Sequence, residues 1–193
     1  MKESEQKKEI RISKSLQKKL GPEYISYRPG WNSTKVAYVE GWTIISLANK
    51  IFGYNGWSSE IKRMEIDYCD TEYDKIHMGV SCVVRITLND GCYREDVGFG
   101  SSENQKTKSV AYEKAKKEAV TDALKRAFRQ FGNALGNCCY DKEFIKDIQS
   151  VAKHKKIVLD KEDLIRKDDI MGVDKEETSN FSFDEDLSAL SNL

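Results

Sequence analysis

The side chains best suited to chemistry in this 193-residue chain are three cations, Lys125, Arg126 and Arg129. At about 100° per residue in an α-helix, they fall within one sector of about 100°. This sector points roughly away from the apolar stripe of the same segment, which we take to be Val120, Leu124, Ala127, Phe128 and Phe131. We expect no acid at i, i+4 spacing to offset Arg126. Since guanidinium groups bind phosphate oxygens bidentately, the spacing predicts a phosphate-binding face, with a solvated helix face as the alternative.

Charge is distributed unevenly along the chain, although its 32 basic and 32 acidic residues cancel. Residues 160–193 hold eleven acids and four bases, and the rest of the chain holds 28 bases and 21 acids. A basic body with an acidic tail is typical of a surface that binds polyanions, although a solvated charged surface gives the same pattern. We divide the chain into a body over 1–156 and an acidic tail over 157–193, which lacks a hydrophobic pattern and is expected to be disordered.

Several classes of protein are disfavoured by the composition. The chain has no run of about 18 uncharged apolar residues and no apolar leader, so we expect neither a membrane span nor export. Five cysteines without a CxxC motif indicate reduced, mostly buried thiols rather than a disulfide framework or a zinc ribbon. We therefore expect a soluble, intracellular protein.

Catalytic constellations are also weak. The two histidines, His77 and His154, differ too much in setting to form a metal pair or a triad base. The glycines after the third predicted strand lack the spacing of a dinucleotide fingerprint, and no GKS or GKT follows. Glu95 and Asp96 are neighbours on a predicted strand, so they point to opposite faces and do not converge on a metal. We predict no enzyme activity, metal or cofactor.

A three-stranded sheet is the clearest structural prediction. Apolar residues alternate strictly from Ile76 to Leu88, which predicts a strand with one buried face. Met64, Ile66 and Tyr68 alternate before it, and an Asn-Asp-Gly turn leads to a further strand over 93–99. Three consecutive antiparallel strands form a meander whose apolar face must be covered.

The cover is expected to be a long helix over 103–131. Ser102 and Gln105 suggest a capping box at its start, and Gly132 ends it. Apolar spacing predicts shorter helices over 9–20, 41–51 and 141–152, and a short strand over 36–39. The fold class is therefore α+β, with a β-β-β-α body flanked by short helices.

Four segments carry a resemblance to a known family: LGPEYIS, FGYNGW, REDVGFG and KEAVTDALKRAFRQFGNALGN. They resemble the N-terminal homologous-pairing domain of the Rad52 family of recombination mediators and single-strand annealing proteins, over about residues 14–147. The resemblance implies a three-stranded sheet crossed by a long helix, similar to double-stranded-RNA-binding folds. It also implies a ring of identical subunits with single-stranded DNA in a basic groove.

The resemblance further implies two sets of DNA-binding residues. The inner site corresponds to Arg28, Tyr38, Lys125, Arg126 and Arg129. A second, outer site, for single-stranded or double-stranded DNA, corresponds to Lys75, Lys106, Lys142 and Lys146, the last being a lysine in place of an arginine. Three of the inner residues are the cations that the helical spacing singles out independently.

The function implied by the resemblance is the annealing of complementary DNA strands, without ATP, in double-strand break repair and homologous recombination in the nucleus. Full-length family members bind replication protein A and a RecA-type recombinase through long C-terminal regions, whereas some forty residues follow the body here. The acidic stretch Phe181–Leu187, with spaced aromatics, is a candidate peptide for such a partner. The alternatives are an RNA-binding module that reads duplex RNA and a magnesium-dependent nuclease.

Overall fold

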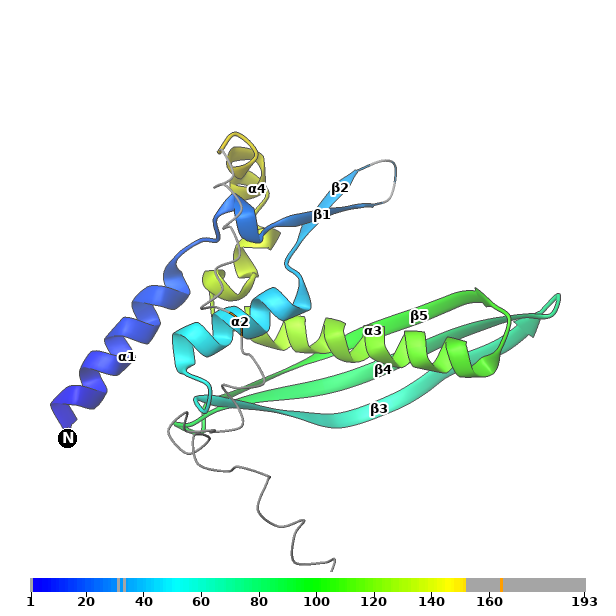
Figure 1. The fold of residues 1–193 in the computed structure, drawn as a ribbon, viewed down its shortest axis with the longest axis horizontal. Helices are drawn as coiled ribbons and strands as arrows, with labels where there is room; N and C mark the ends of the chain where they lie inside the picture. The colour runs from blue at the N-terminus through cyan, green and yellow to red at the C-terminus, as the bar shows by residue number, and fades with distance from the viewer. Residues whose placement is uncertain (1, 31, 33, 152–163, 165–193) are drawn as a thin grey trace, which may run out of the picture. The chain divides into compact units, whose positions relative to one another are not determined.

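An antiparallel sheet of three strands, in the order β3-β4-β5, is crossed by one long helix, α3 (Figure 1). The computed structural model describes residues 2–30, 32, 34–151 and 164, so the predicted tail, including residues 181–187, lies almost wholly outside the described residues. The bounds of these elements are β3 Trp57–Glu72, β4 Lys75–Leu88, β5 Tyr93–Gln105 and α3 Lys108–Arg129. The predicted α+β meander and its covering helix are confirmed.

The alternating apolar residues of β4 suit its place at the centre of the sheet. Its alternate side chains Met78, Val80, Cys82, Val84 and Ile86 are all buried, and they form the core beneath α3. Strict alternation buries one face of the strand and leaves the other less covered. The β4–β5 turn contains a glycine at a φ of 84°, which suits the predicted hairpin.

The start of α3 differs from the prediction. Ser102 and Gln105 belong to β5, where they pair with Met78 and Ile76 of β4. The helix begins at Lys108, because the side chain of Thr107 accepts a hydrogen bond from the backbone N–H of Val110 and caps the first turn. The capping-box prediction was wrong, since ladder pairing with β4 keeps this stretch extended.

The buried face of α3 also differs from the predicted stripe. It consists of Phe128 and five alanines at four-residue spacing: Ala111, Ala115, Ala119, Ala123 and Ala127. Val120 and Leu124 are only half-buried and pack at its side. A Cβ at Gly98 or Gly100 of β5 would overlap the backbone of α3, so glycine is required for the helix to lie this close to the strand.

The remaining elements lie around the C-terminal half of α3. They are α1 (Lys2–Gln17), β1 (Ser26–Pro29), β2 (Lys35–Tyr38), α2 (Gly41–Phe52) and α4 (Lys142–Ile148). Helix α2 buries Ile44, Ala48 and Phe52, and the ring of Trp57 packs edge-on against Phe128 with centroids 4.8 Å apart. The predicted helices near 9–20, 41–51 and 141–152 are confirmed with shifted ends. No helix in the described part of the chain is long and apolar enough to cross a membrane.

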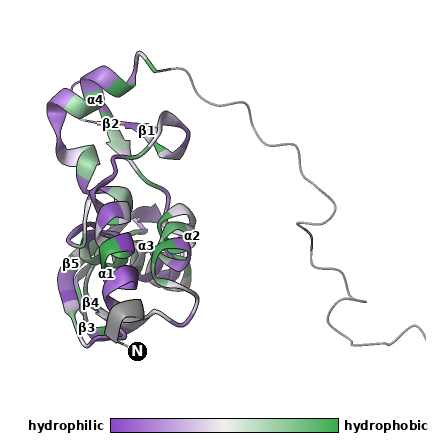
Figure 2. Ribbon diagram, turned by 90° about the vertical axis from the view of Figure 1, so that its left-hand side faces the viewer, coloured by the Kyte–Doolittle hydropathy of each residue, from purple (hydrophilic) through white to green (hydrophobic). Residues whose placement is uncertain are grey.

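Helix α4 and the two-stranded β1–β2 sheet lie together at one end of the molecule in both ribbon views (Figures 1 and 2). In β1–β2, Arg28 pairs with Val36 and Ser26 pairs with Tyr38. Hydrophilic and hydrophobic residues alternate along α4 (Figure 2), and its buried side chains are Phe144 and Ile148.

Asp141 is the N-cap of α4, and its hydrogen bonds predict that the stability of the folded protein depends on pH. Its carboxylate accepts hydrogen bonds from the backbone N–H groups of Glu143 and Phe144 and from Lys19 Nζ, at 3.1, 3.0 and 2.8 Å. The hydrogen bond from Lys19, followed by that from Phe144, lowers the pKa of Asp141 below its ordinary value. Its stabilisation is therefore complete above the ordinary pKa of an aspartate and is lost as the pH falls through the lowered pKa.

We expect Asp141→Asn to lower the thermal unfolding midpoint at neutral pH and to change it little in strongly acidic solution. Scanning calorimetry across the acidic range measures this difference. Asp74→Asn is a matched control, because Asp74 is exposed in the β3–β4 turn at a φ of 58°, which asparagine tolerates. An equal loss for Asp141→Asn at neutral and acidic pH would contradict the role assigned to its charge.

Candidate nucleic-acid interface

A groove of about 450 Å³ lies between the β1–β2 sheet, the C-terminal half of α3 and the segment that leads into α4. The described residues that line it include six cationic side chains and one carboxylate, Asp122. The cations are Arg28, Lys35, Lys125, Arg126, Arg129 and Lys142. Such an excess of positive charge in a concave surface attracts and holds polyanions.

All five residues predicted for the inner site line this groove. Tyr38 links the cations of different elements, because Lys125 Nζ lies 5.5 Å and Arg28 Cζ 5.8 Å from the centre of its ring. The hydroxyl of Tyr38 donates a hydrogen bond to Glu40 Oε1 at 2.7 Å, which fixes the ring. The structure therefore brings together residues nearly a hundred positions apart in the sequence.

The three cations of α3 are less exposed than their helical spacing predicts. Lys125, Arg126 and Arg129 are each half-buried. The β1–β2 sheet and Tyr140 cover this side of the helix, and Arg129 Cζ lies 4.2 Å from the centre of the Tyr140 ring. The cations thus form the wall of a groove rather than an open helix face.

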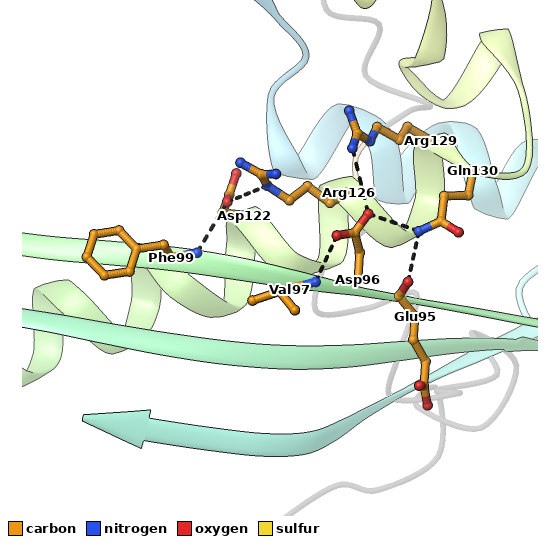
Figure 3. A network of polar contacts seen from close by, with 8 residues as sticks. All are labelled: Glu95, Asp96, Val97, Phe99, Asp122, Arg126, Arg129 and Gln130. Carbon is orange, nitrogen blue, oxygen red and sulfur yellow. Dashed lines mark hydrogen bonds and ion pairs between the residues drawn. The ribbon is translucent and has the colours of Figure 1, made fainter. Parts of the chain in front are cut away.

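Two of these cations form ion pairs that the sequence analysis missed (Figure 3). Arg126 Nε lies 2.7 Å from Asp122 Oδ2, and Arg129 Nη2 lies 3.7 Å from Asp96 Oδ2. The hydrogen bond to Asp122 raises the pKa of Arg126. The expectation that no acid offsets Arg126 was wrong, because Asp122 stands four residues before it on the same helix.

Lys125 differs from the two arginines. Among the residues that the structure describes, no carboxylate lies within ion-pair distance of its ammonium group, and its contact is with the ring of Tyr38. The charge of Lys125 is therefore the most available of the three for a phosphate oxygen.

Lys35, Tyr140 and Lys142 also line the groove, although the resemblance did not assign them to the inner site. The sequence gives little signal for them. Tyr140 meets Arg129 only because the chain turns back after α3 through two short 3-10 helices, Asn133–Leu135 and Asn137–Tyr140.

The residues predicted for the outer site fall into two groups. Lys75 begins β4, and Lys106 follows β5 at the same end of the sheet, since Ile76 pairs with Gln105. Lys142 and Lys146 belong to α4, which lies away from that end of the sheet (Figure 1). One chain therefore does not bring the four lysines together, and Lys142 lies with the inner residues.

The family model for Rad52/22 family double-strand break repair proteins matches residues 8–157. This chain belongs to that family. The match extends beyond both ends of the predicted 14–147 and includes every residue of the two predicted sites. The DNA repair and recombination protein RAD52 of Candida glabrata is 58% identical over 140 residues, which are 72% of this chain and 28% of the relative. RAD52 of Saccharomyces cerevisiae is 56% identical over 140 residues, which are 72% of this chain and 30% of the relative.

A third relative, the DNA repair and recombination protein rad22 of Schizosaccharomyces pombe, is 49% identical over 160 residues, or 82% of this chain and 34% of the relative. The chain thus spans about a third of the length of the curated relatives it matches. The family membership agrees with the resemblance found in the sequence. Within the matched region lie the groove and all the elements that form it.

The thiols are less buried than predicted, because only Cys82 and Cys138 are fully buried while Cys69, Cys92 and Cys139 are half-buried. Cys139 lines the groove. A hydrogen bond with Cys139 lowers the pKa of Cys138 to about 7, and the same bond raises the pKa of Cys139. Cys138 is therefore the more acidic of the two thiols at the edge of the site.

Proposed function

We propose that this chain binds single-stranded DNA in the groove and anneals complementary strands, without ATP, in double-strand break repair and homologous recombination. The observation that carries this proposal is the gathering of six cations around a single groove that has one carboxylate among its described lining residues. Family membership supports the link to DNA repair.

The chemistry of the groove suits a phosphate backbone. Lys125 supplies a point charge, while the planar guanidinium groups of Arg28, Arg126 and Arg129 are suited to bidentate contacts with phosphate oxygens. Binding through phosphates leaves the bases free to pair with a second strand. The energy for annealing then comes from base pairing, so no nucleotide hydrolysis is required.

We propose a ring of subunits, as the family resemblance implies, in which the groove repeats from one subunit to the next. In such a ring the outer site would form only where two subunits meet, with Lys75 and Lys106 from one and Lys142 and Lys146 from the other. The resemblance alone supports a nuclear location. The binding of the tail to replication protein A or a RecA-type recombinase rests on the acidic stretch 181–187 with its spaced aromatics.

A salt series tests the phosphate contacts. We expect the affinity for a labelled single-stranded oligonucleotide to fall linearly with salt on logarithmic axes, with a slope of about −0.7 for each phosphate neutralised. Fluorescence anisotropy measures the affinity, and an annealing assay without nucleotide cofactor measures the activity. Duplex RNA serves as the competitor, since preferential binding of duplex RNA would favour an RNA-binding module instead. Salt-independent binding, or no annealing, would count against the proposal.

A further inference from the structure

Two carboxylates pair with arginines of the groove wall (Figure 3). Asp122 of α3 lines the groove itself, whereas Asp96 of β5 is not among its lining residues. Asp122 of α3 accepts a hydrogen bond from the backbone N–H of Phe99 at 3.3 Å, and Asp96 accepts one from the backbone N–H of Val97 at 2.8 Å. Gln130 Nε2 donates a further hydrogen bond to Asp96 Oδ2 at 2.9 Å. These contacts fix both carboxylates in place before any ligand arrives.

The fixed carboxylates orient the arginines. Arg126 donates to Asp122 through Nε, so this hydrogen bond does not use its two terminal nitrogens. The side chains of Arg126 and Asp122 are 42% and 29% exposed, so both partners of the pair are within reach of a ligand. Arg129 lies between the Tyr140 ring and Asp96. Its ion pair with Asp96, at 3.7 Å, is longer than the 2.7 Å pair of Arg126 with Asp122. Arg126 and Arg129 are therefore already partly neutralised before they meet a phosphate.

We propose that Asp96 and Asp122 are positioning residues that also compete with phosphate for Arg129 and Arg126, so that the groove releases a bound strand readily. This inference rests on the proposed function. A strand must leave the groove once it has paired, and a groove of uncompensated arginines would retain it longer. The carboxylates thus determine how long the groove retains a bound strand before releasing it.

A merely structural role for these carboxylates is the alternative, and it can be tested because α3 has a second acid that contacts β5. Glu118 accepts a hydrogen bond from the backbone N–H of Ser101 at 3.2 Å, but it does not line the groove. Glu118→Gln therefore removes the same charge from the same helix without changing an arginine, and it is the matched control.

Asp122→Asn is the decisive variant, since an amide oxygen can still accept from Phe99 and Arg126 while the charge is lost. We expect the Kd for a single-stranded oligonucleotide to fall at least about threefold, through slower dissociation, because an ion pair that competes with phosphate is removed. Stopped-flow release of the strand to a complementary oligonucleotide should slow in parallel. Glu118→Gln should change neither quantity.

The tighter binding expected of Asp122→Asn must also act through Arg126. In an Arg126→Gln background, Asp122→Asn should no longer tighten binding, whereas a general change in surface charge would still do so. Asp96→Asn, which acts on Arg129, gives an independent test should Asp122→Asn fail to fold. Unchanged or weaker binding by the folded variants, or an equal gain in the Arg126→Gln background, overturns this inference alone. A wild-type protein that binds no single-stranded DNA overturns the proposed function as well.

Discussion

Replacing Lys125 with glutamate is expected to weaken the binding of single-stranded DNA at least about tenfold, and to slow annealing to a similar extent. Of the three α3 cations that line the groove, the substitution removes the one for which the described residues offer no carboxylate partner. It also adds a negative charge beside the phosphates that Arg126 and Arg129 would hold. The slope of log affinity against log salt should become shallower, because at least one phosphate contact is lost from each chain.

The fold should survive this change. Lys125 is half-buried in the groove wall, and its contact with the Tyr38 ring is weak compared with the packing of the alanine face on the opposite side of α3. We therefore expect an unfolding midpoint close to that of the wild type. Lys117→Glu is the matched control, since Lys117 is an exposed lysine of the same helix that does not line the groove. Equal losses of affinity for the two variants would refute a specific role for Lys125.

The sheet could be predicted from the sequence because a single physical pattern determines it. Alternation from Ile76 to Leu88 has one explanation, a strand with one buried face, and the turn after it fixes the direction of the next strand. The start of α3 could not be predicted in the same way. At Ser102 a local capping signal competes with ladder pairing to Met78, and the pairing depends on a strand more than twenty residues away.

The candidate site was predictable in its residues but not in its electrostatics. Helical spacing singled out Lys125, Arg126 and Arg129, and the family resemblance added Arg28 and Tyr38. The pair between Arg126 and Asp122 was readable from the sequence, because Asp122 stands at i, i+4 spacing before the arginine. Tertiary structure was needed for the contact of Arg129 with Tyr140, which no sequence spacing encodes.

The alanine face of α3 was missed for a different reason. Large apolar residues dominate a hydrophobic pattern, so Val120 and Leu124 received more weight than Ala115 or Ala119. Alanine becomes the buried face only because β5 has glycine opposite it, which lets the helix approach closely. The stretch Gly98-Phe99-Gly100, whose glycines lack the spacing of a dinucleotide fingerprint, is therefore a packing motif.

Gly98→Ala should lower the free energy of unfolding by about 3 kcal/mol or more. The added Cβ would overlap the backbone nitrogen of Ala123 and the carbonyl oxygen of Ala119, and backbone atoms cannot move aside as a flexible side chain can. The whole of α3 would have to shift away from β5, opening gaps around the buried alanines. Urea denaturation followed by circular dichroism measures the loss.

Phe99→Ala is the control for Gly98→Ala, because Phe99 is the next residue of β5 and its side chain is 47% exposed. We expect a loss of less than about 1 kcal/mol for this variant. A wild-type unfolding midpoint for Gly98→Ala would show that α3 does not depend on close contact with β5. Gly98→Ala and Lys125→Glu also separate two causes of lost DNA binding. Gly98→Ala should lose binding together with the fold, since α3 carries the groove wall, whereas Lys125→Glu should lose binding while the fold persists.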